Sequence, residues 1–141
     1  MLVADVMTRD VITVDISNDL AQAVSVMSEH DIRHLPVLED GVRLAGVISD
    51  RDLRQLSLAG VRDMESYERL QARLRAPLTT VMSADVLTVD PETDLSEAVD
   101  LMVGEKIGAL PVVDPETDTL VGMVSYVDVL RVARNALSEG I

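Results

Sequence analysis

The chain has 141 residues, no cysteine, and a formal net charge of −13. This length fits one ordinary domain or two small repeats, and the absence of cysteine excludes disulfides, thiolate catalysis and Cys-ligated zinc. A chain with this much negative charge repels nucleic acid and anionic lipid. It contains no Phe or Trp, so it lacks the aromatic side chains on which the bases of single-stranded nucleic acid usually stack.

No targeting or membrane signal is found along the chain. The first residues, Met1 to Asp5, contain no basic region followed by a long apolar run, so no signal peptide is expected. No apolar run approaches the length of a membrane span. We therefore expect a cytoplasmic protein that binds neither membranes nor nucleic acid.

The chain repeats itself. Residues 6–15 align without a gap with residues 81–90, and after one inserted residue in the second copy Ser49 aligns with Ser125. A duplication of this length indicates two similar structural units. We expect a first repeat over residues 1–58, a helical linker over 59–77 and a second repeat over 78–141.

Each repeat is expected to fold as β-α-β-β-α, a mixed α/β (α+β) class. In the first, Val11 to Val14 reads as a short strand or extended segment, and Asp19 caps a helix with an apolar stripe at helical spacing. Strands follow at Leu35 to Leu38 and Leu44 to Ile48, joined by a turn. The second repeat predicts the same elements, with Asp94 and Glu97 at the start of its first helix.

The remaining segments read as helices. Residues 63–75 have helical composition, Gly60 is expected to break the helix before them, and Pro77 suits the first turn of a short helix. The last helix, residues 127–137, is apolar nearly all round. One unit cannot cover both faces of such a helix, so a homodimer is expected.

Ser49 stands where a buried strand meets a helix, and Asp52 follows one turn later. The first N–H groups of a helix have no internal partner, which makes the junction a potential anion site, and the carboxylate can accept hydrogen bonds from sugar hydroxyls. The same spacing also makes a capping box. Ser125 and Asp128 repeat the pattern, which favours a function beyond capping.

These motifs resemble a pair of CBS domains, the Bateman module. The resemblance is carried by Val6-Met7-Thr8, Ile32-x-x-Leu35-Pro36-Val37 and Gly46-x-x-Ser49-x-x-Asp52, together with their second-repeat counterparts. It covers nearly the whole chain. It implies two units that pack by their sheets about a pseudo-twofold axis and leave two clefts.

In CBS pairs that bind ligands, the clefts take adenosine compounds, so the resemblance implies AMP, ADP or ATP, or else S-adenosylmethionine or an adenine dinucleotide. No cofactor is required. The Asp of the motif contacts ribose and its Ser contacts phosphate or ribose. The nucleotide-binding residues implied for this chain are Thr13, Arg33, His34, Pro36, Ser49, Arg51, Asp52, Thr88, Ile107, Ala109, Pro111, Ser125 and Asp128.

The basic candidates all lie in the first repeat. Arg33, His34 and Arg51 stand at positions that often reach phosphates in nucleotide-binding members of the family, whereas the second repeat offers a small, apolar wall. We therefore expect the basic residues of the first repeat to bind the phosphate tail of the nucleotide. The alternative is that the arginines only pair with neighbouring acids such as Asp31 and Asp50.

Three classes of function are compatible with these residues. A regulatory nucleotide sensor, acting on an unknown protein in trans, is favoured; a ligand-free interaction scaffold is the alternative; an enzyme is not expected. His30 and His34 are four residues apart, but a helix boundary between them argues against a metal site, and no Ser-His-Asp set is suggested.

Overall fold

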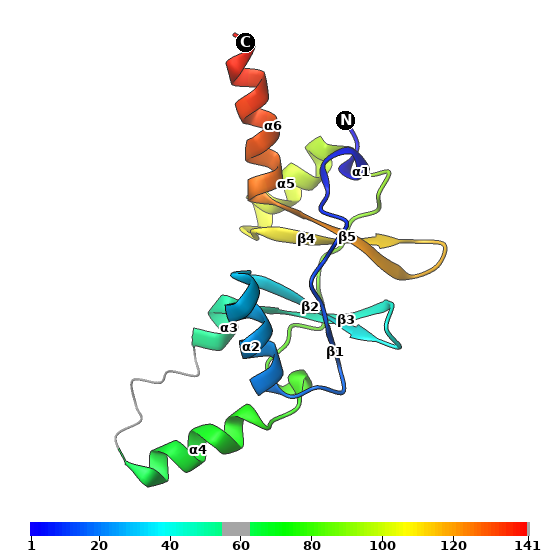
Figure 1. Cartoon of the computed structure of the whole chain (residues 1–141). Helices are drawn as coiled ribbons and strands as arrows, with labels where there is room; N and C mark the ends of the chain where they lie inside the picture. Colours follow the sequence, from blue (N-terminus) through cyan, green and yellow to red (C-terminus); the bar gives the residue numbers. More distant parts are fainter. Residues whose placement is uncertain (55–62, 141) are drawn as a thin grey trace. The chain divides into compact units, whose positions relative to one another are not determined.

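The computed structural model describes residues 1–54 and 63–140 and is mixed α/β, as expected (Figure 1). The chain divides into two compact units. The Ser49 unit comprises Ile12–Val86, and the Ser125 unit comprises Met1–Val11 together with Leu87–Ile141. The expected break at Gly60 lies outside the described residues.

The Ser49 unit is built on a three-stranded sheet of order β1-β2-β3. Strand β1 (Val14–Asp15) pairs in parallel with β2 (His34–Glu39), which pairs antiparallel with β3 (Arg43–Ser49). The expected elements are present, although only the end of the segment from Val11 to Val14 is paired as a strand. The helices are α2 (Leu20–His30), α3 (Asp50–Arg54), α4 (Met64–Leu74) and the short 3-10 helix η2 (Leu78–Thr80).

Helix α2 packs on this sheet through its apolar stripe. Leu20, Ala23 and Met27 are buried at helical spacing against Leu35 and Ile48 of the strands. Removing such side chains from water is the main source of the unit's stability.

The Ser125 unit contains a two-stranded sheet of β4 (Ala109–Asp114) and β5 (Thr119–Ser125) with α5 (Leu95–Glu105) and α6 (Tyr126–Ser138). The first strand expected here is reduced to one parallel bridge between Val89 and Val112. Asp94 caps α5 by accepting from the backbone N–H of Ser96, so the expected capping partner Glu97 is replaced by its neighbour.

An N-terminal segment, residues 1–11, belongs to the Ser125 unit and includes α1 (Val3–Val6). It runs beside β5 (Figure 1), where Thr8 and Met123 exchange backbone hydrogen bonds of 2.8 and 2.9 Å. The same exchange recurs in the Ser49 unit, where Ser83 and Val47 are joined by two bonds of 3.0 Å. Each hairpin is therefore extended by a segment from the start of the other repeat.

Helix α6 buries only one of its apolar faces. Val129 and Val132 pack against the core of the Ser125 unit, whereas Val127, Leu130 and Leu137 are 55%, 64% and 73% exposed. Among the described residues, no helix combines the length and the apolar character that a membrane crossing requires.

Candidate functional site

Ser49 and Asp52 form a reciprocal pair at the end of β3. The Asp52 Oδ2 atom accepts from the Ser49 backbone N–H at 2.8 Å and from its hydroxyl at 3.0 Å, and the Ser49 Oγ atom accepts from the Asp52 N–H at 3.2 Å. The pair is a capping box, as one interpretation of the sequence expected. It also holds a half-buried carboxylate in one orientation, with Oδ1 unbonded within the described residues.

Ser125 and Asp128 make the same pair, with 2.9 and 3.1 Å bonds to Asp128 Oδ2. Here the second oxygen is engaged as well. Asp128 Oδ1 accepts from the Thr8 hydroxyl at 3.4 Å and lies 3.7 Å from the Arg131 guanidinium. Asp128 is only 6% exposed and is the one buried charged residue in the described part of the chain.

The other candidates of the Ser49 unit surround Ser49. His34 stands opposite Ser49 in the β2–β3 ladder, and the buried Pro36 stands opposite Val47. Thr13 is half-buried just before β1. The sheet register therefore brings His34 and the Ser49–Asp52 pair together.

Arg33 and Arg51 are exposed, and neither forms an ion pair within the described residues. Of the two acids named as possible partners, Asp50 pairs instead with Arg54 at 3.1 Å, and Asp31 forms no ion pair within the described residues. The Arg33 carbonyl accepts from the Asp50 N–H at 2.9 Å, which anchors the Arg33 backbone beside the start of α3. Both guanidinium groups are thus available to an anion.

Burial lowers the pKa of His34 below its ordinary value of 6.5, and the charge of Arg33 acts in the same direction, while Asp50 and Asp52 oppose it. The imidazole is therefore neutral near pH 7. A neutral ring can still donate one hydrogen bond to a phosphate, but it supplies no charge.

The candidates of the Ser125 unit lie mostly on β4. Ala109 stands opposite Ser125 in the β4–β5 ladder, Pro111 is buried opposite Met123, and Ile107 packs against the core just before the strand. Thr88 is exposed, and no hydrogen bond joins it to Ser125 or Asp128 within the described residues.

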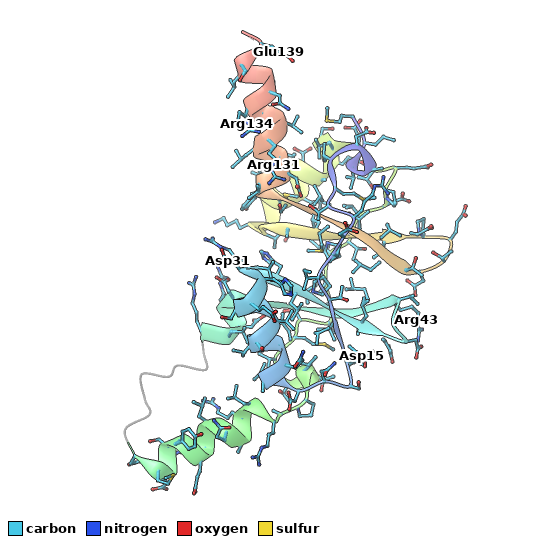
Figure 2. All side chains as sticks on the ribbon, viewed as in Figure 1. Asp15, Asp31, Arg43, Arg131, Arg134 and Glu139 are labelled. Atoms are coloured by element: carbon cyan, nitrogen blue, oxygen red, sulfur yellow. The ribbon has the colours of Figure 1, made fainter. Side chains whose placement is uncertain are left out.

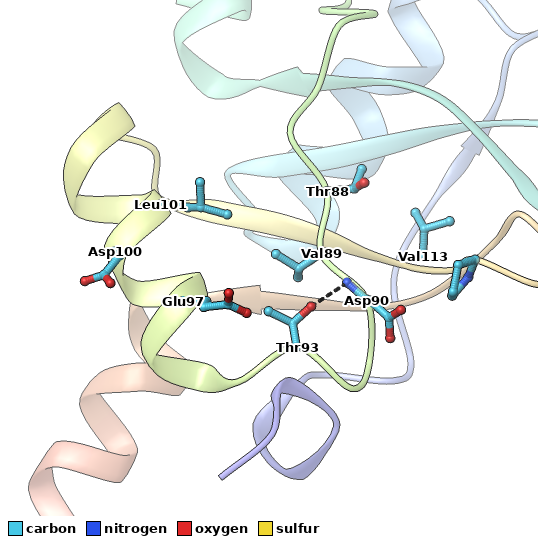
Figure 3. Close-up of a pocket in the computed structure, with 9 residues that line it drawn as sticks. Thr88, Val89, Asp90, Thr93, Glu97, Asp100, Leu101 and Val113 are labelled. Atoms are coloured by element: carbon cyan, nitrogen blue, oxygen red, sulfur yellow. Dashed lines mark hydrogen bonds between the residues drawn. The ribbon is translucent and has the colours of Figure 1, made fainter.

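Thr88 instead lines a hollow of about 670 Å³ (Figure 3). Val89, Leu101 and Val113 give it an apolar lining. Three carboxylates, those of Asp90, Glu97 and Asp100, also line it. Negative charge on this side disfavours a phosphate next to Thr88.

Two contacts of the site were missed by reasoning from the sequence. Thr8 was assigned only to a family motif, although it bonds Asp128 from 120 residues away. Arg131, which lies on α6 with Arg134 (Figure 2), was not among the candidates, although its guanidinium stands 3.7 Å from Asp128 Oδ1. Its spacing of three residues from Asp128 was the signal that could have revealed it.

No group of three or more His, Cys, Asp or Glu side chains is placed to hold a metal ion within residues 1–54 and 63–140. The described residues offer hydrogen-bond acceptors, apolar strands and two guanidinium groups, those of Arg33 and Arg51, that form no ion pair with a described acid. Such a set can bind a polar ring system with hydroxyls and a phosphate.

Comparisons with known proteins bear on this chemistry. The family model of the CBS domain matches residues 3–59 and 78–135. A CBS domain-containing protein of Bacillus subtilis, YhcV, is 34% identical over 126 residues, which cover 89% of this chain and 81% of the relative. The structure of CBSX2 in complex with AMP is similar at 29% identity with a TM-score of 0.79, and the match covers 96% of this chain and 97% of that chain.

CBSX2 is a CBS-pair protein from Arabidopsis thaliana. A third similarity, 29% identity over 127 residues, is to the inosine-5'-monophosphate dehydrogenase of Methanocaldococcus jannaschii. That match covers 90% of this chain but only 22% of the dehydrogenase.

Proposed function

Because this chain belongs to the CBS-domain family and contains two CBS repeats, we propose that it is a regulatory module that binds adenine nucleotides. The observation that carries the proposal is the duplicated Ser–Asp pair, above all Ser49 with Asp52. Its carboxylate is held by the cap, and no described residue bonds its Oδ1 atom. A carboxylate can accept hydrogen bonds from ribose hydroxyls.

AMP is the first ligand to test, because CBSX2 has been solved as an AMP complex. ADP, ATP, S-adenosylmethionine and adenine dinucleotides share its adenosine portion. Aliphatic strands can hold a purine without aromatic residues, and Pro36 and Pro111 place buried apolar surface next to the pairs. We propose that Thr13, Thr88, Ile107 and Ala109 complete the contacts.

In the Ser49 unit, the phosphate tail is proposed to contact Arg33, His34 and Arg51. The two arginines bring positive charge that no acid within the described residues neutralises. His34 contributes a hydrogen bond from its neutral ring. Charge-assisted bonds from arginine to phosphate are among the strongest available to a protein.

The proposed activity is binding without catalysis, with the output passed to a regulated protein. The similarity to the dehydrogenase is limited to 22% of that enzyme's length, so it gives no reason to expect the enzyme's reaction here. The exposed face of α6 favours a second function, association of two copies into a homodimer, with or without ligand.

A thermal-shift series with AMP, ADP and ATP tests the nucleotide proposal. Nucleotide at a hundred times its dissociation constant adds about 2.7 kcal/mol to the free energy of unfolding. That should raise the Tm by roughly 3–6 °C for a chain of this size. No shift with any adenine nucleotide at millimolar concentration would leave the interaction scaffold as the better account.

A further inference from the structure

The two Ser–Asp pairs have nearly the same local geometry but different surroundings. In both, the Asp Oδ2 atom accepts two bonds from the Ser, of 2.8 and 3.0 Å for Asp52 and of 2.9 and 3.1 Å for Asp128. A difference in the affinity of the two pairs for a ribose would therefore arise from the contacts of Oδ1 and from the accessibility of the carboxylate.

At Asp128, Oδ1 is already engaged. The Thr8 hydroxyl donates to it at 3.4 Å, and the Arg131 guanidinium lies 3.7 Å away. The Asp128 side chain is 6% exposed. A ribose hydroxyl can use Oδ1 only by displacing the Thr8 hydroxyl or by sharing the oxygen with it.

At Asp52, no hydroxyl or guanidinium group of the described residues contacts Oδ1. Ser83 occupies the place of Thr8, since its backbone exchanges bonds of 3.0 Å with Val47 just as Thr8 does with Met123. The Ser83 hydroxyl makes no hydrogen bond to Asp52, and Oδ1 of this half-buried carboxylate has no partner in the described part of the chain. Within residues 1–54 and 63–140, its remaining acceptor sites are open.

Thr8 and Ser83 occupy equivalent positions and differ by one methyl group, which restricts the threonine side chain. The β-branched side chain of threonine has restricted χ1 freedom, whereas serine rotates more freely. The backbone pairing of Thr8 with Met123 fixes where the side chain starts, and β-branching limits where the hydroxyl can go. Both act to keep the Thr8 hydroxyl on Asp128.

We propose that Thr8 makes the two adenosine sites unequal: Asp52 binds the ribose of the first nucleotide, and the Thr8 hydroxyl competes for Asp128 and lowers the affinity of the second site. This inference rests on the proposed function and adds its regulation. Thr8 lies on the N-terminal segment, so any partner that draws this segment away from β5 would also open the second site.

The test is a titration of the full chain with AMP, followed by calorimetry and by the methyl NMR signals of ¹³C-labelled methionine. Met82 lies against Gly46 in the Ser49 unit and Met7 lies against Gly122 in the Ser125 unit, so the two signals report on different units. Asp52→Asn and Asp128→Asn assign each binding step to its site. The wild type should fill the Asp52 site first, with the Asp128 site about tenfold weaker or more, which corresponds to one hydrogen bond to a charged group.

Thr8→Val removes the hydroxyl and keeps the shape of the side chain. It should raise the affinity of the Asp128 site about tenfold and leave the Asp52 site unchanged. Ser83→Ala is the matched control, because the Ser83 hydroxyl makes no bond to Asp52, and it should change neither site. The urea midpoint of each variant verifies that it is folded.

If Thr8→Val leaves the Asp128 site as it was or weakens it, while Asp52→Asn still weakens the first binding step, the unequal-site proposal is wrong and the nucleotide function stands. If AMP binding responds to neither Asp52→Asn nor Asp128→Asn, the proposed function itself is wrong.

Discussion

Met82 packs so closely on Gly46 that a Cβ atom on this glycine would lie 2.9 Å from the Met82 Sδ atom and 2.7 Å from the Ser83 carbonyl oxygen. Gly122 has the same relationship to Met7, with 2.7 Å from a Cβ to Sδ. The glycine of each Gly-x-x-Ser-x-x-Asp motif therefore makes room for the segment that extends the hairpin.

Gly46→Ala should destabilise the protein by about 1–3 kcal/mol, the usual cost of overpacking, because the Ser83 backbone must move. Gly104→Ala is the control. Gly104 lies in α5 with open space around it, and alanine in a helix is favoured over glycine by about 1 kcal/mol. Urea unfolding measures both, and equal destabilisation by the two variants would contradict the packing role.

Asp52→Asn should weaken AMP binding while leaving folding nearly unchanged. Asparagine keeps the size of the side chain and some capping ability, but a charge-assisted bond to ribose is lost, which costs about 1.5–3 kcal/mol. Calorimetry with AMP and with 2′,3′-dideoxyadenosine monophosphate measures the loss, because the dideoxy compound lacks the two hydroxyls. The variant should reduce the preference for AMP over the dideoxy compound; an unchanged preference would place the ribose elsewhere.

The Arg33→Ala, Arg51→Ala double variant should weaken ATP binding more than ADP binding and AMP binding least, because each lost arginine removes charge-assisted bonds to phosphate. Arg54→Ala serves as the control, since Arg54 is already paired with Asp50 on the surface. Calorimetric titrations with all three nucleotides give the comparison. Wild-type affinities and ranking in the double variant would show that the tail is held by other groups.

Stability should depend on pH through His34. Burial lowers the pKa of this imidazole in the folded protein below its ordinary value of 6.5, so the unfolded chain takes up the proton first. The resulting stabilisation is fully present above pH 6.5 and decreases as the pH falls through 6.5 toward the pKa of the folded state.

His34→Gln removes this contribution, so the urea midpoint should fall less between pH 7.5 and pH 5.5 in the variant than in the wild type. His30→Gln is the control, because His30 is exposed at the end of α2. Identical pH profiles for His34→Gln and wild type would mean that His34 is solvated in the folded protein.

The exposed face of α6 should mediate self-association. Leu130→Glu places a charge among Val127, Leu130 and Leu137, and it should shift the protein toward the monomer mass of 15.3 kDa in light scattering. Gln22→Glu, on the exposed side of α2, adds the same charge away from this face. A wild-type protein that is monomeric at micromolar concentration would contradict the homodimer.

Much of the local structure followed from the sequence because its causes are local. The stripe of Leu20, Ala23 and Met27 predicted the buried side of α2, and Ser–x–x–Asp spacing predicted both capping boxes. A capping box needs only the residues of one helical turn, and a helical stripe needs only its own period. The repetition of these patterns identified the duplicated unit and the family.

The tertiary structure determines which of the two Ser–Asp pairs has a hydrogen bond to the second oxygen of its carboxylate. The N-terminal segment belongs to the unit of the second repeat, and this places Thr8 on Asp128. Pairing between Thr8 and Met123 joins residues far apart in sequence, and no local period records it. The two Ser–Asp pairs have the same residues at the same spacing, so the sequence does not distinguish them. They differ in the structure because the contacts of each carboxylate depend on side chains that only folding brings within hydrogen-bond distance.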